Sequence, residues 1–169
     1  MLDLAGEWSL ADAAGTLRVA MAIPGDNLTA LHAAGVIPDP YWGRNEYALR
    51  ELAARDWVAE RRFIHDGGPC DLLVEGLDTV AEVRLNGVLV LQAANAFRRH
   101  RVDVAGALRA GENEISVTFR SVIAEAAARQ AAQPFFVPYH EGNCPLPNGN
   151  MLRKPQCDFG WDWNVALAP

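Results

Sequence analysis

Two strands and the turn between them can be recognised in the stretch Val80-Ala81-Glu82-Val83-Arg84-Leu85-Asn86-Gly87-Val88-Leu89-Val90-Leu91. The tightest hairpin turns need positive φ at both central positions, and Asn and Gly adopt positive φ more readily than other residues. Apolar residues flank the Asn86-Gly87 pair on both sides. The stretch therefore predicts a β-hairpin with strands at residues 80–85 and 88–91.

More strands are expected on both sides of this hairpin. An alternation of apolar and polar residues with a period of two is typical of a half-buried strand. The alternation is clearest at residues 17–23 and at residues 114–120, the second of which follows an expected turn at residues 110–113. The other expected strands are residues 57–64, 71–75 and 102–104.

Three short helices are expected between the strands. Asp26 or Asn27 can cap a helix at residues 28–34, and Asn45 can cap one at residues 46–55. Ser121 can cap an alanine-rich helix that runs to residue 133, where Pro134 would end it.

Residues 134–157 should form a long irregular loop, because prolines and glycines recur along them. Long loops in compact domains are usually either functional or disordered, and the aromatic and charged residues of this loop favour a function. Short strands at turn-bounded spacing, with few helices inserted, favour an antiparallel β-sandwich, and we expect its jelly-roll variant. The chain is expected to form a single domain over residues 1–169.

Composition excludes several classes of function. The chain has 169 residues, 50% of them hydrophobic, a formal charge of -6 and a pI near 5.1. It lacks the basic field that attracts nucleic acid, and it has no apolar run near the roughly 20 residues of a membrane span. Its N-terminus does not resemble a secretory signal, so a cytoplasmic location is expected.

No cofactor or metal is expected. The three cysteines are odd in number and have no CxxC spacing, so we interpret them as free thiols. The four histidines are too widely spaced to match a known metal motif. The cysteines are Cys70, Cys144 and Cys157.

The most distinctive run near the C-terminus is Arg153-Lys154-Pro155-Gln156-Cys157-Asp158-Phe159-Gly160-Trp161-Asp162-Trp163. It places the carboxylate of Asp162 between two indoles and beside cationic and amide donors. A pyranose has an apolar face that stacks on aromatic rings, and its hydroxyls hydrogen-bond well to charged planar groups. The run therefore indicates a carbohydrate-binding segment.

The same residues also allow a purely structural interpretation. Residues at i and i+2 of a strand share one face, so Trp161 and Trp163 would pack in the core while Asp162 points the other way. A buried carboxylate needs a partner, which Arg153 or Lys154 would supply. The segment would then stabilise the fold without touching a sugar.

Three stretches together resemble the N-terminal domain of β-mannosidases in glycoside hydrolase family 2. The first is Asp39-Pro40-Tyr41-Trp42-Gly43-Arg44-Asn45-Glu46, the second runs from Gly76 to the Asn86-Gly87 turn, and the third ends in Trp161-Asp162-Trp163. The resemblance covers almost the whole chain. The second stretch is shared by many members of family 2, whereas the first and third are more typical of mannosidases.

This resemblance implies a jelly-roll sugar-binding domain that precedes immunoglobulin-like domains and a catalytic (β/α)8 barrel. In such retaining enzymes two glutamates about 5 to 5.5 Å apart perform the catalysis, and both belong to the barrel. No segment of this chain resembles the barrel. We therefore expect a domain that is truncated at its C-terminus, carries no catalytic residue and is inactive alone.

The resemblance also implies a substrate-binding role for Trp161, Asp162 and Trp163, in a loop that reaches the barrel mouth and contacts mannose in the −1 subsite. Asp162 would accept hydrogen bonds from sugar hydroxyls, and the two indoles would wall the pocket. Asn164 stands where Gly most often follows in this family. The residues expected to support the loop are Arg153, Lys154 and Gln156.

The expected function is that of an exo-acting retaining β-mannosidase, with a β-mannoside oligosaccharide and the chain's own downstream barrel as partners. Two alternatives stay open at this point. The same scaffold used alone would be a carbohydrate-binding module that does not hydrolyse its ligand. A related family 2 enzyme, such as a β-galactosidase or β-glucuronidase, would act on a different sugar.

Overall fold

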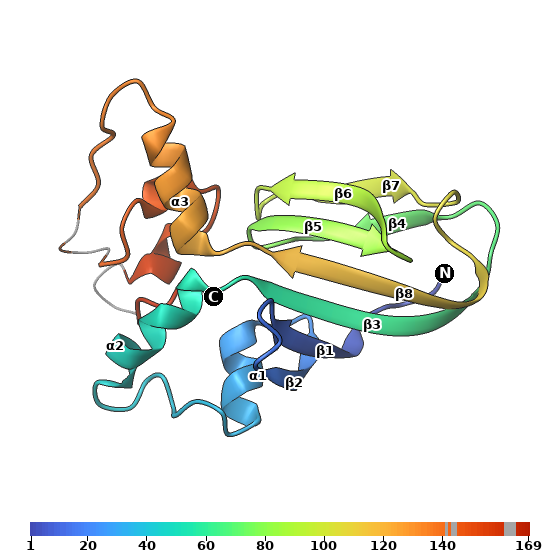
Figure 1. The fold of residues 1–169 in the computed structure, drawn as a ribbon, viewed down its shortest axis with the longest axis horizontal. Helices are drawn as coiled ribbons and strands as arrows, with labels where there is room; N and C mark the ends of the chain where they lie inside the picture. The colour runs from blue at the N-terminus through green and yellow to red at the C-terminus, as the bar shows by residue number, and fades with distance from the viewer. Residues whose placement is uncertain (141, 143–144, 161–164) are drawn as a thin grey trace.

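The computed structural model describes residues 1–140, 142, 145–160 and 165–169. They form a β-sandwich with most of the helices gathered at one end (Figure 1). The strands are β1 Gly6–Asp12, β2 Arg18–Ile23, β3 Trp57–Asp66, β4 Asp71–Val74, β5 Val80–Leu85, β6 Val88–Ala94, β7 His100–Asp103 and β8 Ala110–Phe119.

The larger sheet has six strands in the order β2-β1-β3-β8-β5-β6, and β4 pairs with β7 in a second sheet. All strand pairs in both sheets are antiparallel. Side chains such as Leu10, Val83 and Val117 form the buried core, and Leu72 and Val102 of the small sheet pack against it. The expected antiparallel β-sandwich is confirmed.

Six short helices connect or cover the strands in the described part of the chain. The helices are α1 Asn27–Ala33, α2 Asn45–Leu49 and α3 Val122–Ala131, with the 3-10 helices η1 Arg50–Ala54, η2 Gly149–Met151 and η3 Gln156–Phe159. None of them has the length and apolar character needed to cross a membrane.

The central hairpin forms as the sequence predicts. Asn86 and Gly87 have φ values of 51° and 82°, and β5 and β6 pair on either side of them. The Asn86 side chain donates to Ala107 O and to Asn113 Oδ1, both at 2.8 Å, and its Oδ1 accepts from Glu114 N. The turn residue therefore also joins the hairpin to β8.

One expected turn is wrong. Residues 110–113 begin β8 and pair with β3 from Asp66↔Ala110 to Phe63↔Asn113. The buried Asn113 side chain explains the difference, because its amide bonds Arg109 and Gly111 and satisfies the chain reversal just before the strand. Strand β1 is an addition, since no strand is expected at its position.

The expected helix caps are correct at two places and wrong at one. Asp26 accepts from Thr29 N, and Ser121 accepts from Ala124 N. Asn45 does not cap the second helix but is its first residue, and its amide donates to Asp39 O. The helix expected at residues 46–55 is split, because its second half tightens into η1.

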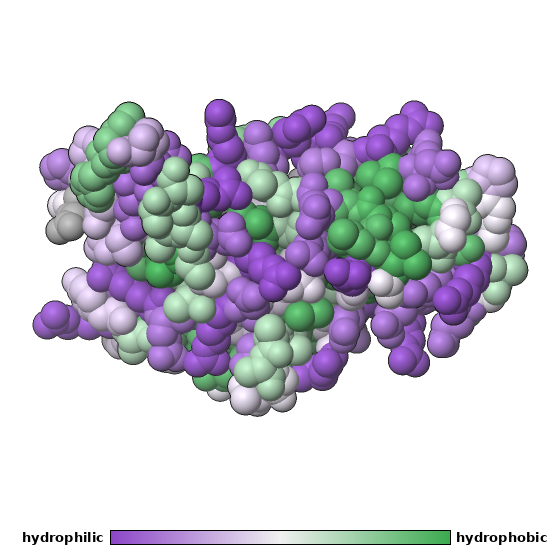
Figure 2. Space-filling view, turned by 45° about the horizontal axis from the view of Figure 1, so that its top comes forward, coloured by the Kyte–Doolittle hydropathy of each residue, from purple (hydrophilic) through white to green (hydrophobic). Residues whose placement is uncertain are grey.

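The surface is mostly hydrophilic, but Figure 2 shows an apolar area over the half of the sandwich away from α3. Strand β6 has a strand neighbour on one side only, among the described strands. Its residues Val88 and Leu89 are exposed. The edge of the large sheet therefore combines a free main-chain edge with apolar side chains.

The turn between β1 and β2 depends on the carboxylate of Asp12. This buried carboxylate accepts hydrogen bonds from Thr16 N at 2.8 Å, Leu17 N at 3.0 Å and the Thr16 hydroxyl. The Thr16 hydroxyl, helped by the two N–H groups and by Arg55, holds the pKa of Asp12 below its ordinary value of 3.8, although burial opposes the shift.

We expect Asp12→Asn to lower the free energy of unfolding at pH 7. Because the folded-state pKa is depressed, the stabilisation by Asp12 is fully present above the unfolded-state pKa and is lost as pH falls through the folded-state pKa. Urea unfolding at pH 7 and near pH 3 should show a difference between wild type and variant that shrinks in acid. An equal difference at both pH values would contradict this account, and Asp66→Asn, at an exposed carboxylate, is the control.

Candidate functional site

The predicted substrate-binding residues Trp161, Asp162 and Trp163 lie outside the described residues. The structure does describe the chain on both sides of them, at residues 145–160 and 165–169. The geometry of the site is therefore built from these two flanking segments and from the elements that hold them.

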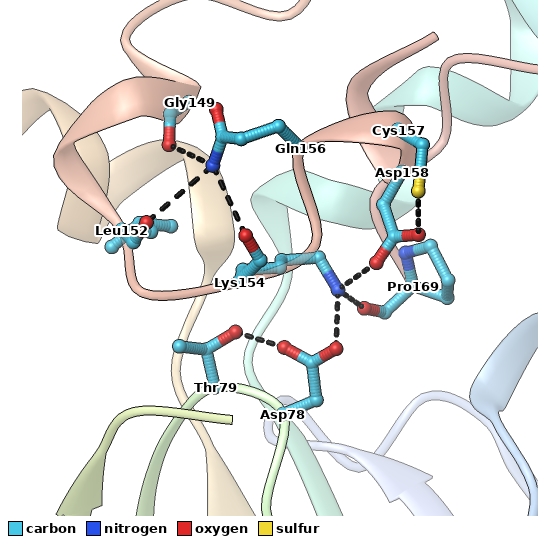
Figure 3. A network of polar contacts seen from close by, with 9 residues as sticks. All are labelled: Asp78, Thr79, Gly149, Leu152, Lys154, Gln156, Cys157, Asp158 and Pro169. Carbon is cyan, nitrogen blue, oxygen red and sulfur yellow. Dashed lines mark hydrogen bonds and ion pairs between the residues drawn. The ribbon is translucent and has the colours of Figure 1, made fainter. Parts of the chain in front are cut away.

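Lys154 is the central polar contact of this region. Its Nζ lies 2.8 Å from Asp78 Oδ2, 2.8 Å from Asp158 Oδ2 and 2.7 Å from the main-chain oxygen of Pro169 (Figure 3). The Lys154 side chain is 0% exposed. An ammonium has three donors, and here each has an acceptor, so the charge is buried without an unsatisfied donor.

Lysine suits this place better than arginine. Lys154 is the only lysine in a chain with 15 lysines and arginines in total. Its compact ammonium can bond three acceptors that converge from different directions, whereas a guanidinium is planar and presents its donors in a fixed fork. The choice of residue therefore follows from the arrangement of the three oxygens.

The flanking segments are also joined through the main chain. Ala168 N donates to Asp158 O at 3.0 Å, so a main-chain hydrogen bond joins the two flanking segments. Ala166 N donates to Oε2 of Glu46 in α2 at 3.2 Å, so this helix holds the C-terminal flank. The chain leaves η3 at Gly160, whose φ of 117° lies in a region that L side chains rarely adopt.

A second, small apolar core lies under this region. Its largest member is Phe159, which is 0% exposed. The other members come from η1, α3 and the two flanking segments, so the core ties the irregular C-terminal part to the helices. They are Ala53, Ala126, Leu146, Leu152, Ala166 and Ala168.

Gln156 and Arg153, the other two predicted support residues, contact this region in different ways. Gln156 Nε2 lies 3.2 Å from Gly149 O and 3.1 Å from Lys154 O, so its amide stabilises the turn around η2. Arg153 has an exposed side chain, and its main chain forms a parallel bridge with Asn95 at the end of β6. Their role in loop support stays a prediction.

Sequence reasoning missed two residues that contact Lys154. Asp78 lies in a stretch that carries the family resemblance, but nothing local indicates its partner, which is 76 positions away. Asp158 lies four residues after Lys154, at a spacing that brings side chains together on a helix. That spacing is the one signal that would have found the second contact.

A family model described as "Glycosyl hydrolase 2 galactose-binding domain-like" matches residues 8–169. The chain belongs to this family. The match covers the sandwich and both segments that flank the predicted sugar-binding residues, so the fold and the candidate site fall within one family domain.

Several curated proteins that match this chain are β-mannosidases. A probable β-mannosidase of Caenorhabditis elegans is 33% identical over 99% of this chain and 20% of its own length. The β-mannosidase of Capra hircus is 34% identical over 98% of this chain and 20% of its own length. The chain thus spans about a fifth of the length of these relatives.

The solved structures that match this chain include a β-mannosidase and a more distant glycosidase. The β-D-mannosidase of Dictyoglomus thermophilum matches with a TM-score of 0.88 and 29% identity, over 99% of this chain and 21% of that one. An exo-chitosanase of Amycolatopsis orientalis matches with a TM-score of 0.63 and 16% identity, over 68% of this chain and 16% of that one. The second likeness shows the fold alone.

We expect Gly149→Ala to disturb the small core. An added Cβ at residue 149 would lie 2.8 Å from two ring carbons of Phe159, and this fully buried ring has little room to move. Overpacking of this kind costs about 1 to 3 kcal/mol. Denaturant unfolding of the 1–169 domain would measure the loss.

Gly106→Ala is the matched control, because an added Cβ there meets nothing within 4 Å. It should leave the free energy of unfolding within about 0.5 kcal/mol of wild type, as is usual for surface changes. A Gly149→Ala variant as stable as this control would contradict the packing described for Phe159.

Proposed function

We propose that this chain is the N-terminal domain of an exo-acting, retaining β-mannosidase, which removes terminal β-linked mannose from the non-reducing end of oligosaccharides. The observation that supports this most is the similarity to proteins named β-mannosidase over 98 to 99% of the chain. The alternative sugars of family 2 lack comparable support, because a β-glucuronidase of Dictyoglomus thermophilum, at 19% identity, shares the fold alone.

The chemistry divides between this domain and the rest of the protein. A retaining glycosidase forms and then hydrolyses a covalent glycosyl-enzyme intermediate, with one glutamate as nucleophile and another as acid and base. In this proposal both glutamates belong to a downstream barrel. The domain described here supplies binding groups for the sugar and performs no bond-breaking step.

Within this proposal Trp161, Asp162 and Trp163 contact the mannose at the rim of the active site. The Asp162 carboxylate accepts hydrogen bonds from sugar hydroxyls, and charge-assisted hydrogen bonds of this kind are among the strongest available. The indoles pack on the C–H face of the ring. The contacts of Asp158 with Ala168 N and of Lys154 with Asp158 and Pro169 support the proposal, because they join the two described segments that flank these residues.

Asp162→Asn in the full-length protein should lower kcat/KM for an aryl β-mannoside by more than tenfold. Asparagine keeps the shape but loses the charge that strengthens the contact in the transition state. A tenfold loss corresponds to about 1.4 kcal/mol of transition-state stabilisation. Asp66→Asn, at an exposed carboxylate at the end of β3, should leave kcat/KM unchanged. A smaller loss in Asp162→Asn would rule out direct contact in the transition state.

The domain of residues 1–169 by itself should not hydrolyse β-mannosides, and it should bind mannose only very weakly, because the other half of the pocket is missing. Titration calorimetry with mannose tests the second point. Binding with a sub-millimolar Kd would show that the domain carries a complete site and would favour a stand-alone binding module.

A further inference from the structure

We propose that Lys154 is a positioning residue, which fixes both ends of the segment that carries Asp162 against the β-sandwich. The proposal rests on the proposed function, because the position of the segment affects catalysis only if Asp162 contacts the sugar. Lys154 itself does not face a ligand, since its side chain is fully buried. It acts through the residues that it holds.

The three acceptors of the Lys154 ammonium come from three parts of the chain. Asp78 lies directly before the buried Thr79 and two residues before β5, so it is joined closely to the sandwich. Asp158 precedes the segment at residues 161–164, and Pro169 follows it. One cation therefore joins the two described flanks of the segment to each other and to the residue that precedes Thr79 and β5 (Figure 3).

The charge of Lys154 is as important as its hydrogen bonds. Without it, the carboxylates of Asp78 and Asp158 would converge with the Pro169 oxygen on a site that holds no cation. Like charges repel, and a carbonyl oxygen offers no donor to either carboxylate. With a neutral side chain at residue 154, the repulsion between the two carboxylates should therefore push Asp158 and its flanking segment away from Asp78.

Small displacements of a binding group have large effects on catalysis. A shift of about 1 Å in a group that orients the substrate can cost roughly a hundredfold in rate. The Ala168 N to Asp158 O hydrogen bond joins the same two flanks that Lys154 holds. Loss of the Lys154 charge should therefore reduce catalysis through Asp162.

The test uses the full-length protein and the variant Lys154→Met, which has a chain of similar length without charge. We expect kcat/KM for an aryl β-mannoside to fall by at least tenfold. Asp162→Asn and the double variant Lys154→Met/Asp162→Asn are measured in the same assay. If Lys154 acts through Asp162, the double variant should lose little more than Asp162→Asn alone, because interacting sites are not additive.

Additive losses would overturn the proposal, since they would show that Lys154 affects activity independently of Asp162. A loss below tenfold in Lys154→Met, together with a large loss in Asp162→Asn, would overturn it as well and leave the proposed function intact. No loss in Asp162→Asn would instead refute the proposed sugar contact. The two failures are thus distinguishable.

Arg120→Met is the matched control, because Arg120 also joins two carboxylates, Asp56 at 3.1 Å and Glu82 at 2.9 Å, within the sandwich region. It should lower Tm but leave kcat/KM within about twofold, because neither of its carboxylate partners is an acceptor of the Lys154 ammonium. An equal loss of kcat/KM in Arg120→Met would show a general effect of instability and overturn the proposal.

If Lys154→Met does not fold, Asp158→Asn takes its place. The asparagine keeps an acceptor oxygen for the ammonium but removes one negative charge. It should give a smaller loss of kcat/KM with the same lack of additivity toward Asp162→Asn, and additive losses would again overturn the proposal.

Discussion

The ammonium of Lys154 joins the sandwich to the irregular C-terminal part of the chain. A buried charge without partners costs several kcal/mol, so the fold must bring acceptors to it. Asp78, Asp158 and the Pro169 carbonyl occupy its three donors. This requirement constrains three separate segments at once, and the small core around Phe159 packs beneath them.

In this arrangement the sheets supply a scaffold, and the predicted binding residues come after the last described strand in the sequence. The fold is shared with an exo-chitosanase at 16% identity, so likeness of the fold alone does not indicate which sugar a protein binds. Rigid scaffolds commonly carry their binding residues on loops, and function must be argued from those residues. Here the contact between Lys154 and Asp78 joins the segments that flank the predicted binding residues to the sandwich.

Local chemistry made much of the fold predictable. The Asn86-Gly87 turn needs only two residues that accept positive φ, and the caps at Asp26 and Ser121 need one side chain near the first free N–H groups. Residues 110–113 have the composition of a turn, so the sequence predicted a turn there. In the structure the Asn113 side chain bonds the main chain at Arg109, where the chain reverses, and β8 already pairs with β3 from Ala110 onward.

The candidate site shows what the sequence alone does not predict. Its composition, a carboxylate between indoles beside a lone lysine, can be recognised in the linear chain, and so can the family that shares it. The partner of that lysine could not, because Asp78 is 76 positions away and its own neighbours give no sign of the contact. Periodicity, capping and turn preference depend on residues a few positions apart. They can therefore be recognised from the sequence alone. The pairing of a buried charge depends on which distant oxygens the packed sheets and helices bring within 3 Å, and only the folded chain decides that.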